Sequence, residues 1–189
     1  YQVIEASNSQ PYSHIHRPGI AVGGHCIPVY PRLYLWNDPA ADIVRTARAV
    51  NASMPDFAVD LLAEAHGDLA GQRVVVLGAA YRGGVKETAF SGVFATVGAL
   101  RTRGAEVTVD DPMYSDEELT ALGFTPHSSG SEVDAAILQT DHAEYRALPP
   151  ADLPGVRTFV DGRNVTDADA WSGVTRRVIG LPQDAEAAR

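Results

Sequence analysis

Cys26 is the side chain of this sequence best suited to covalent chemistry. It is the only cysteine among the 189 residues, and it directly follows Gly23, Gly24 and His25. Glycine adopts backbone conformations closed to other residues and lets a ligand approach closely. A thiolate is a strong nucleophile, and a neighbouring histidine or arginine favours its formation. The run therefore predicts an exposed nucleophile, with backbone N–H groups nearby for an oxyanion.

Two other interpretations of this run stay open. A free cysteine is often a buried packing residue. Metal binding is the second, because His14, His16, His25 and Cys26 offer nitrogen and sulfur ligands. Their spacing matches no ligand motif, so we expect no metal site.

A second chemical pattern is the apolar run that ends in VLGAAYRGG, with Asp110 and Asp111 closing the next apolar run. It is similar to a dinucleotide-binding fingerprint, but Ala80 stands where the second glycine belongs, and the segment up to the next helix is too long for a tight turn. Ligands of open α/β sheets bind at the carboxyl ends of the strands. The pattern thus favours a loop that contacts a nucleotide over an NAD site, with a solvated loop as the remaining alternative.

The N-terminal elements that must position Cys26 are helical and irregular. Residues 1–8 look like the end of a helix, and residues 9–36, rich in Pro, Gly, His and aromatic residues, show no clear period. Such long irregular segments are usually functional loops. Asp38 followed by Pro39 predicts a helix start, Pro55 a second start, and Gly67 the end.

From residue 72 onward, short apolar strands alternate with helical segments. Strands are predicted at 73–81, 105–112, 133–140, 156–164 and 176–182, and helices near 94–103, 117–122 and 142–148. This alternation implies right-handed crossovers and a parallel sheet with helices on both faces. The predicted fold class is α/β, a helical segment followed by a Rossmann-like domain.

Composition excludes several functional classes. The net charge of -9 and the pI of about 5.0 give no general electrostatic reason to bind nucleic acid or an anionic membrane surface. No apolar run approaches the roughly 20 residues of a membrane span, and no signal peptide is visible. A single cysteine allows no internal disulfide, which predicts a cytoplasmic setting. The chain opens at Tyr1 in mid-pattern, and we expect it to be the middle of a longer protein.

The motifs together resemble the UDP-glucose/GDP-mannose dehydrogenase family. GGHCIPVYP is similar to the family's cysteine loop, with the histidine of the branch that oxidises UDP-N-acetyl-hexosamines. The resemblance continues, in the family's order, through VIEASN, VNASMP, VVVLGAAYRGGVKET, EVTVDDP, TDHAEYR and VDGRN. It covers nearly the whole chain but only the C-terminal half of the family pattern.

The resemblance implies an NAD-dependent oxidation of a UDP-sugar at the C6 alcohol to a uronic acid, in which Cys26 forms a thioester. It further implies that Gly19, Gly23, Gly24, His25, Tyr81 and Arg82 contact the substrate. It assigns Arg163 to the NAD cofactor. The expected setting is polysaccharide biosynthesis, with the NAD-binding domain and the catalytic lysine outside this chain.

The resemblance also implies a domain organisation and a homodimer. Residues 1–37 would end the central region with the cysteine loop, 38–70 would form dimerisation helices, 71–182 the Rossmann-like nucleotide-sugar domain, and 183–189 a disordered tail. A helix that is apolar beyond one stripe needs a second partner. The apolar residues on more than one face of the central helices are Ile43, Val44, Val50, Phe57, Val59 and Leu62.

Several positions depart from the family pattern. Tyr30 stands where many members have an aspartate that helps manage the hydrolytic water, and Ala89 replaces an arginine of the loop after the first strand. The Gly-Pro-Gly signature is loosened to Gly19-Ile20-Ala21. Two function classes therefore stay open, part of an active dehydrogenase or a catalytically inactive nucleotide-sugar-binding or regulatory module. The fragment alone is expected to be inactive.

Overall fold

A five-stranded parallel sheet forms the core of the computed structural model, which describes residues 1–12 and 14–182. The strands are β1 (Arg73–Leu77), β2 (Glu106–Asp110), β3 (Ala135–Leu138), β4 (Thr158–Asp161) and β5 (Thr175–Val178). Their order is β2-β1-β3-β4-β5. All neighbours pair in parallel, with Val76 opposite Val109 on one side and Ile137 on the other. This confirms the predicted α/β class, while the tail at 183–189 lies outside the described residues.

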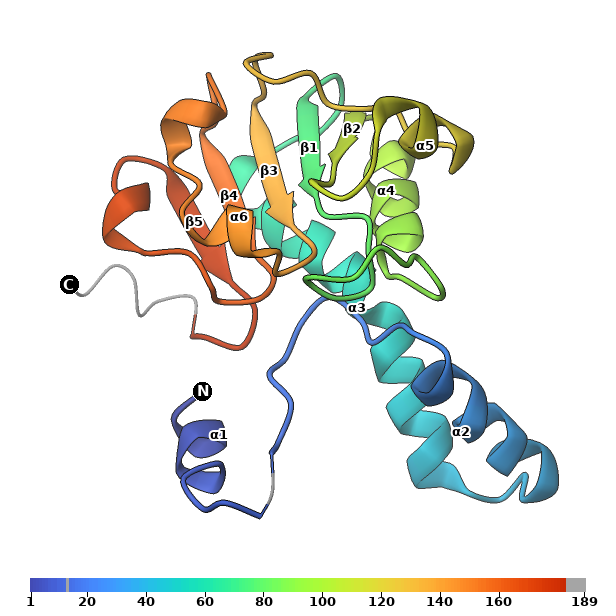
Figure 1. Ribbon diagram of the computed structural model, residues 1–189. Coiled ribbons are helices and arrows are strands. Elements are labelled where there is room, and N and C mark those ends of the chain that lie inside the picture. Colours follow the sequence, from blue (N-terminus) through green and yellow to red (C-terminus); the bar gives the residue numbers. More distant parts are fainter. Residues whose placement is uncertain (13, 183–189) are drawn as a thin grey trace.

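Both faces of the sheet are covered, as Figure 1 shows. The helices α3 (Asp42–His66) and α4 (Val93–Thr102) pack on one face, where Val74 and Val76 meet Leu62 and Leu100 in one apolar cluster. The other face carries α6 (Ala143–Arg146) and the short 3-10 helices η1 (Pro150–Asp152) and η2 (Asp169–Trp171). Strand side chains alternate between the faces, which explains the nearly uninterrupted apolar runs in the sequence.

The remaining helices are α1 (Gln2–Ser7), α2 (Cys26–Asn37) and α5 (Asp116–Ala121). In α5, Ser115 and Glu118 form a capping box. In Figure 1, α2 runs beside the outer half of α3, and the two helices project from the sheet as a hairpin. Among the described helices, none has the length and apolar character needed to cross a membrane.

The structure corrects the predicted boundaries around Cys26. Residues 26–37, expected to belong to an irregular segment, form the helix α2. Pro28 is its third residue, where a backbone N–H would have no partner within the helix, so a proline there costs no hydrogen bond. Cys26 therefore opens a helix instead of lying in the middle of a loop.

The predicted starts of the next helix are also wrong. The helix α3 begins at Asp42, because Asp38 instead ends α2 and its carboxylate accepts the Ala40 N–H at 3.2 Å. Pro55 does not start a second helix but lies buried inside the 25-residue α3. Packing of Ala58, Val59 and Leu62 into the core outweighs the local cost of a proline, about 3 kcal/mol. Gly67, with φ of +99°, ends the helix as predicted.

Candidate active site

The segment that leads into Cys26 lies across the carboxyl edge of the sheet. The Ile20 side chain is buried, and its carbonyl oxygen accepts a hydrogen bond from the Gln139 amide at 2.8 Å. Gln139 directly follows β3, and Gly162, which follows β4, lies against the Ile20 side chain. In Figure 1 the segment reaches this edge from α1 and passes on to α2. The sheet order reverses between β1 and β3, which is where open α/β sheets bind ligands.

Gly23 and Gly24 pack directly on the loop between β1 and α4. The Gly24 N–H donates to the Ala89 carbonyl oxygen at 2.8 Å. A methyl group on Gly23 would lie 2.7 Å from both the Phe90 carbonyl oxygen and the Tyr81 Cβ atom. Gly24 has a φ of +88°, in the left-handed region that favours glycine, and its Cα faces the Tyr81 ring. The two glycines thus join the cysteine loop to the nucleotide-contacting loop predicted from the sequence.

Cys26 is exposed at the first position of α2. No side chain caps this end of the helix. The free backbone N–H groups and the dipole of a helix N-terminus favour a thiolate or an oxyanion. Because the thiol is exposed, the alternative interpretation of a buried packing cysteine is wrong.

His25 and Glu87 face each other beside Cys26. The His25 Nε2 atom lies 3.5 Å from a Glu87 carboxylate oxygen, and both side chains are partly exposed. The other carboxylate oxygen accepts the Ala89 N–H at 2.9 Å. This backbone hydrogen bond and, after it, the contact with His25 hold the pKa of Glu87 below its usual value. Glu87 could not be found from the sequence, because no local pattern shows that this loop meets the histidine.

Tyr81 and Arg82 occupy the same loop. The Arg82 guanidinium lies 5.9 Å from the centre of the Tyr81 ring, and its Nε atom donates to the Tyr81 hydroxyl at 3.4 Å. Arg82 is exposed. The structure thus gathers Gly23, Gly24, His25, Cys26, Tyr81 and Arg82 at the carboxyl end of β1.

Gly19 and Arg163 form a separate group at the carboxyl end of β4. Gly19 leaves no side chain between its backbone and the Arg163 guanidinium, which also pairs with Asp141 at 3.3 Å. A pocket of about 350 Å³ opens here. Its lining residues are Arg17, Asp141, Arg146, Arg163, Asn164 and Val165. Three guanidinium groups suit a phosphate or carboxylate ligand, and the sequence analysis missed Arg17 and Arg146 because they lie far apart along the chain.

A buried ion pair holds the strand-end loops together. The Asp111 carboxylate accepts the N–H groups of Ala79 and Ala80 and lies 3.2 Å from His142 Nε2, with both side chains almost fully buried. Burial acts against both charges, but the His142 hydrogen bond and the N–H donors keep the pKa of Asp111 below its usual value. The Asp111 bond likewise keeps the pKa of His142 above its usual value. The pair is therefore a structural link between the loops after β1, β2 and β3.

This edge does not fit a dinucleotide bound in the Rossmann manner. Asp111, in the place of the acid that binds a ribose, is fully used by internal hydrogen bonds. The N-terminal end of α4 is covered, because Gly92 lies against the Ile20 carbonyl and the Gln139 amide. That this loop is not the main NAD site stays a prediction.

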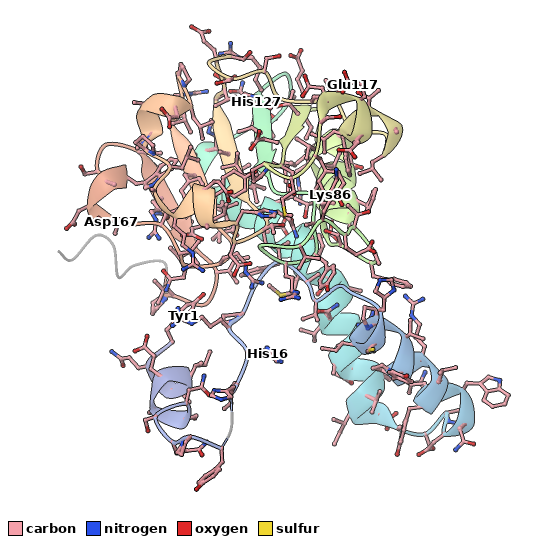
Figure 2. All side chains as sticks on the ribbon, in the orientation of Figure 1. Tyr1, His16, Lys86, Glu117, His127 and Asp167 are labelled. Carbon is pink, nitrogen blue, oxygen red and sulfur yellow. The ribbon has the colours of Figure 1, made fainter. Side chains whose placement is uncertain are left out.

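The four candidate metal ligands do not gather. Among residues 1–12 and 14–182, no group of three or more His, Cys, Asp or Glu side chains is placed to hold a metal ion. Figure 2 shows His16 on the extended segment that leads from α1 toward the sheet. The metal hypothesis gains no support from this arrangement.

The fold is an open α/β domain, and an exposed cysteine lies at the start of the helix that follows its carboxyl edge. Two family models match the chain: the UDP-binding domain of the UDP-glucose/GDP-mannose dehydrogenase family at residues 75–168 and its central domain at residues 1–53. The chain belongs to the UDP-glucose/GDP-mannose dehydrogenase family.

Its relatives are UDP-sugar dehydrogenases. The UDP-N-acetyl-D-mannosamine dehydrogenase of Pyrococcus horikoshii is 34% identical over 177 residues, which cover 87% of this chain and 40% of that protein. The solved structure of UDP-D-ManNAc dehydrogenase from the same organism superposes with a TM-score of 0.77, covering 95% of this chain and 44% of that one. The solved structure of a UDP-glucose dehydrogenase from Pyrobaculum islandicum is 28% identical in sequence and superposes with a TM-score of 0.79. The match covers 94% of this chain and 42% of that one. The chain thus spans about two fifths of the length of these relatives.

Proposed function

We propose that this chain is part of an NAD-dependent nucleotide-sugar dehydrogenase that oxidises the C6 alcohol of a UDP-sugar to a uronic acid through a thioester on Cys26. The observation that carries the proposal is the position of Cys26. It opens a helix with an uncapped N-terminus, and the loop before it is bonded to the carboxyl edge of a UDP-binding-type sheet. A sugar held by that edge would present its reacting carbon to the thiol.

In this proposal, Cys26 attacks the intermediate aldehyde, and the free N–H groups at the start of α2 stabilise the resulting oxyanion. NAD, when bound, would supply the hydride acceptor, and Arg163 is the residue of this chain that we assign to its phosphates. Oxidation leaves the sugar attached to Cys26 as a thioester, which water hydrolyses. The described residues offer no dinucleotide site of their own, so we assign the main cofactor contacts to a domain outside this chain.

We assign the substrate contacts to the cluster at the end of β1. Gly23 and Gly24 would let the sugar nucleotide approach the backbone, with His25 and Tyr81 beside it. The exposed Arg82 guanidinium suits a diphosphate. Gly19 completes the contacts from the β4 side, next to Arg163.

The whole protein would have the organisation expected from the sequence. Residues 1–37 end a central domain, residues 38–70 form dimerisation helices, and residues 71–182 bind the nucleotide sugar. We propose a cytoplasmic homodimer that supplies uronic acids to polysaccharide biosynthesis, without a nucleic-acid or membrane partner.

An inactive nucleotide-sugar-binding module is the second candidate, and two positions favour it. Tyr30 is 64% exposed on α2, one helical turn after Cys26, and offers no carboxylate. Ala89 accepts the Gly24 N–H through its carbonyl oxygen and offers no guanidinium. Uronate production by the full-length protein separates the two candidates.

Calorimetric titration with UDP-N-acetyl-D-mannosamine tests the binding part of the proposal. Replacing Arg82 with Gln should weaken binding about tenfold or more, because a charge-assisted hydrogen bond contributes about 1.5 to 3 kcal/mol. Arg101→Gln, an exposed change near the end of α4, is the control and should leave affinity unchanged. Equal affinities for the two variants would contradict the assignment of Arg82.

A further inference from the structure

The pair formed by His25 and Glu87 is built like an acid–base unit next to the nucleophile. Glu87 faces Nε2 of His25 at 3.5 Å. A carboxylate at that atom favours the tautomer with the proton on Nε2, which leaves the lone pair of Nδ1 free to accept a proton. His25 precedes Cys26 directly, as the N-cap residue of α2.

Glu87 is itself fixed by the loop that carries it. Its second carboxylate oxygen accepts the Ala89 N–H at 2.9 Å, and its backbone carbonyl accepts the Tyr81 N–H at 3.0 Å. The Ala89 carbonyl in turn accepts the Gly24 N–H. The Glu87 carboxylate and the backbone just before His25 are therefore bonded to the same loop.

The other titratable groups near this edge are engaged elsewhere. Asp111 and His142 are buried against each other, and Asp141 pairs with Arg163. Tyr30 is close to Cys26 along α2, but a neutral phenol is a weaker base than imidazole. His25 is the base that remains beside the thiol.

We propose that His25 is the general base that hydrolyses the Cys26 thioester and that Glu87 is its positioning residue; this rests on the proposed function. The oxygen of a water molecule forms the new bond to the thioester carbonyl carbon, while one water proton moves to Nδ1 of His25. The C–S bond breaks, and its electron pair leaves with the sulfur as a thiolate. The other proton stays on the new carboxyl group until solvent takes it, and His25 returns its proton to the sulfur.

Rapid-quench intact mass spectrometry of the full-length protein with UDP-N-acetyl-D-mannosamine and NAD tests the proposal. It follows the formation and the breakdown of the Cys26 adduct separately. His25→Gln removes the base. Glu87→Gln removes the charge but keeps an oxygen that can accept the Ala89 N–H, and Glu87→Asp restores the charge.

The matched control is Glu118→Gln. Glu118 on α5 pairs with Lys86, whose Nζ atom lies 2.5 Å from its carboxylate, so this variant loosens the same loop away from His25. Figure 2 shows Lys86 on that loop. If loosening of the loop were the cause of slow hydrolysis, this control would show it too.

We expect the adduct to form in every variant, more slowly in His25→Gln because His25 also contacts the substrate, and the test compares the breakdown rates, which are measured separately. Breakdown should slow about 100-fold or more in His25→Gln and about tenfold in Glu87→Gln, with partial recovery in Glu87→Asp and no change in Glu118→Gln. Equal breakdown rates in every variant would overturn the role of His25 and Glu87. The hypothesis that Cys26 forms a thioester would survive that result. Absence of any adduct, together with normal uronate formation by Cys26→Ser, would instead overturn the proposed function and this inference with it.

Discussion

At the scale of single residues, the site depends on positions where a side chain is absent. Gly23 brings two loops together that lie more than 50 residues apart in the chain, because nothing separates its Cα from Phe90 and Tyr81. Glycine is also needed at residue 24 for its positive φ. The sequence indicated glycines near a ligand, but it could not show that their immediate partner is another loop of the protein.

Gly23→Ala should therefore push the cysteine loop away from the loop between β1 and α4. The added methyl group meets backbone and a Cβ atom at 2.7 Å, neither of which can rotate aside. We expect a loss of about 1 to 3 kcal/mol in the free energy of unfolding, measured by urea denaturation. The control is Gly98→Ala within α4, where no atom lies within 4 Å of the new methyl group. The free energy of unfolding of Gly98→Ala should rise by about 0.5 to 1 kcal/mol. A Gly23→Ala variant more stable than Gly98→Ala would contradict the account.

At the scale of elements, strands were predictable and proline-containing helices were not. The strands β1, β3 and β4 were predictable as apolar runs because a buried parallel strand needs apolar residues on both faces. The edge strands β2 and β5 are only half-buried and carry weaker patterns. Pro28, Pro31 and Pro55 all lie within helices, although proline is locally a helix-breaking signal. Pro28 stands in the first helical turn, where no N–H partner is lost, whereas Pro55 is tolerated through long-range packing of α3, which is invisible to a local pattern. Glu87, Arg17 and Arg146 could not be predicted as site residues for the same reason, because only the tertiary structure brings them to the site.

The ion pair between the starts of β1 and β3 gives a prediction about pH. Asp134 accepts two hydrogen bonds from the Arg73 side chain, and this contact lowers the pKa of Asp134 from 3.8 to about 2. A carboxyl group whose pKa is lower in the folded than in the unfolded state stabilises the fold at pH values above its unfolded-state pKa. This stabilisation is lost as the pH falls from about 4 to 2. Asp134→Asn should lower the free energy of unfolding by about 1 to 2 kcal/mol at pH 7.

Urea denaturation of Asp134→Asn and wild type at several pH values checks this prediction. The difference between the two proteins should shrink steadily below pH 4 and be nearly gone at pH 2. A difference that stays constant over this range would show that the charge of Asp134 contributes nothing to stability.

At the scale of the whole molecule, the α2–α3 hairpin leaves an apolar surface uncovered. Ile43, Val50 and Phe57 lie seven residues apart along α3 and are exposed by 87%, 56% and 48%. This spacing places them on one stripe of the helix. By contrast, Val59 and Leu62 point into the core. The exposed stripe supports the predicted homodimer, in which a second copy would cover it.

The combined change Ile43→Lys and Val50→Lys should separate the dimer, because it places charges in the centre of the proposed interface. Light scattering should then give the mass of one chain for this variant and of two chains for the wild type. Phe94→Lys, an exposed site on α4 outside the hairpin, should remain dimeric. A wild-type protein that stays monomeric at high concentration would contradict the prediction.

The most direct test of the central claim is the fate of Cys26 during turnover. In the full-length protein, Cys26→Ser should lower uronate formation by orders of magnitude while UDP-sugar binding stays nearly intact, because the proposed substrate contacts lie in the loops and not in the thiol. Intact mass of the wild type, quenched during the reaction with UDP-N-acetyl-D-mannosamine and NAD, should show the sugar attached at Cys26. The serine variant should show no thioester. Uronate production by Cys26→Ser at nearly the wild-type rate would contradict the account.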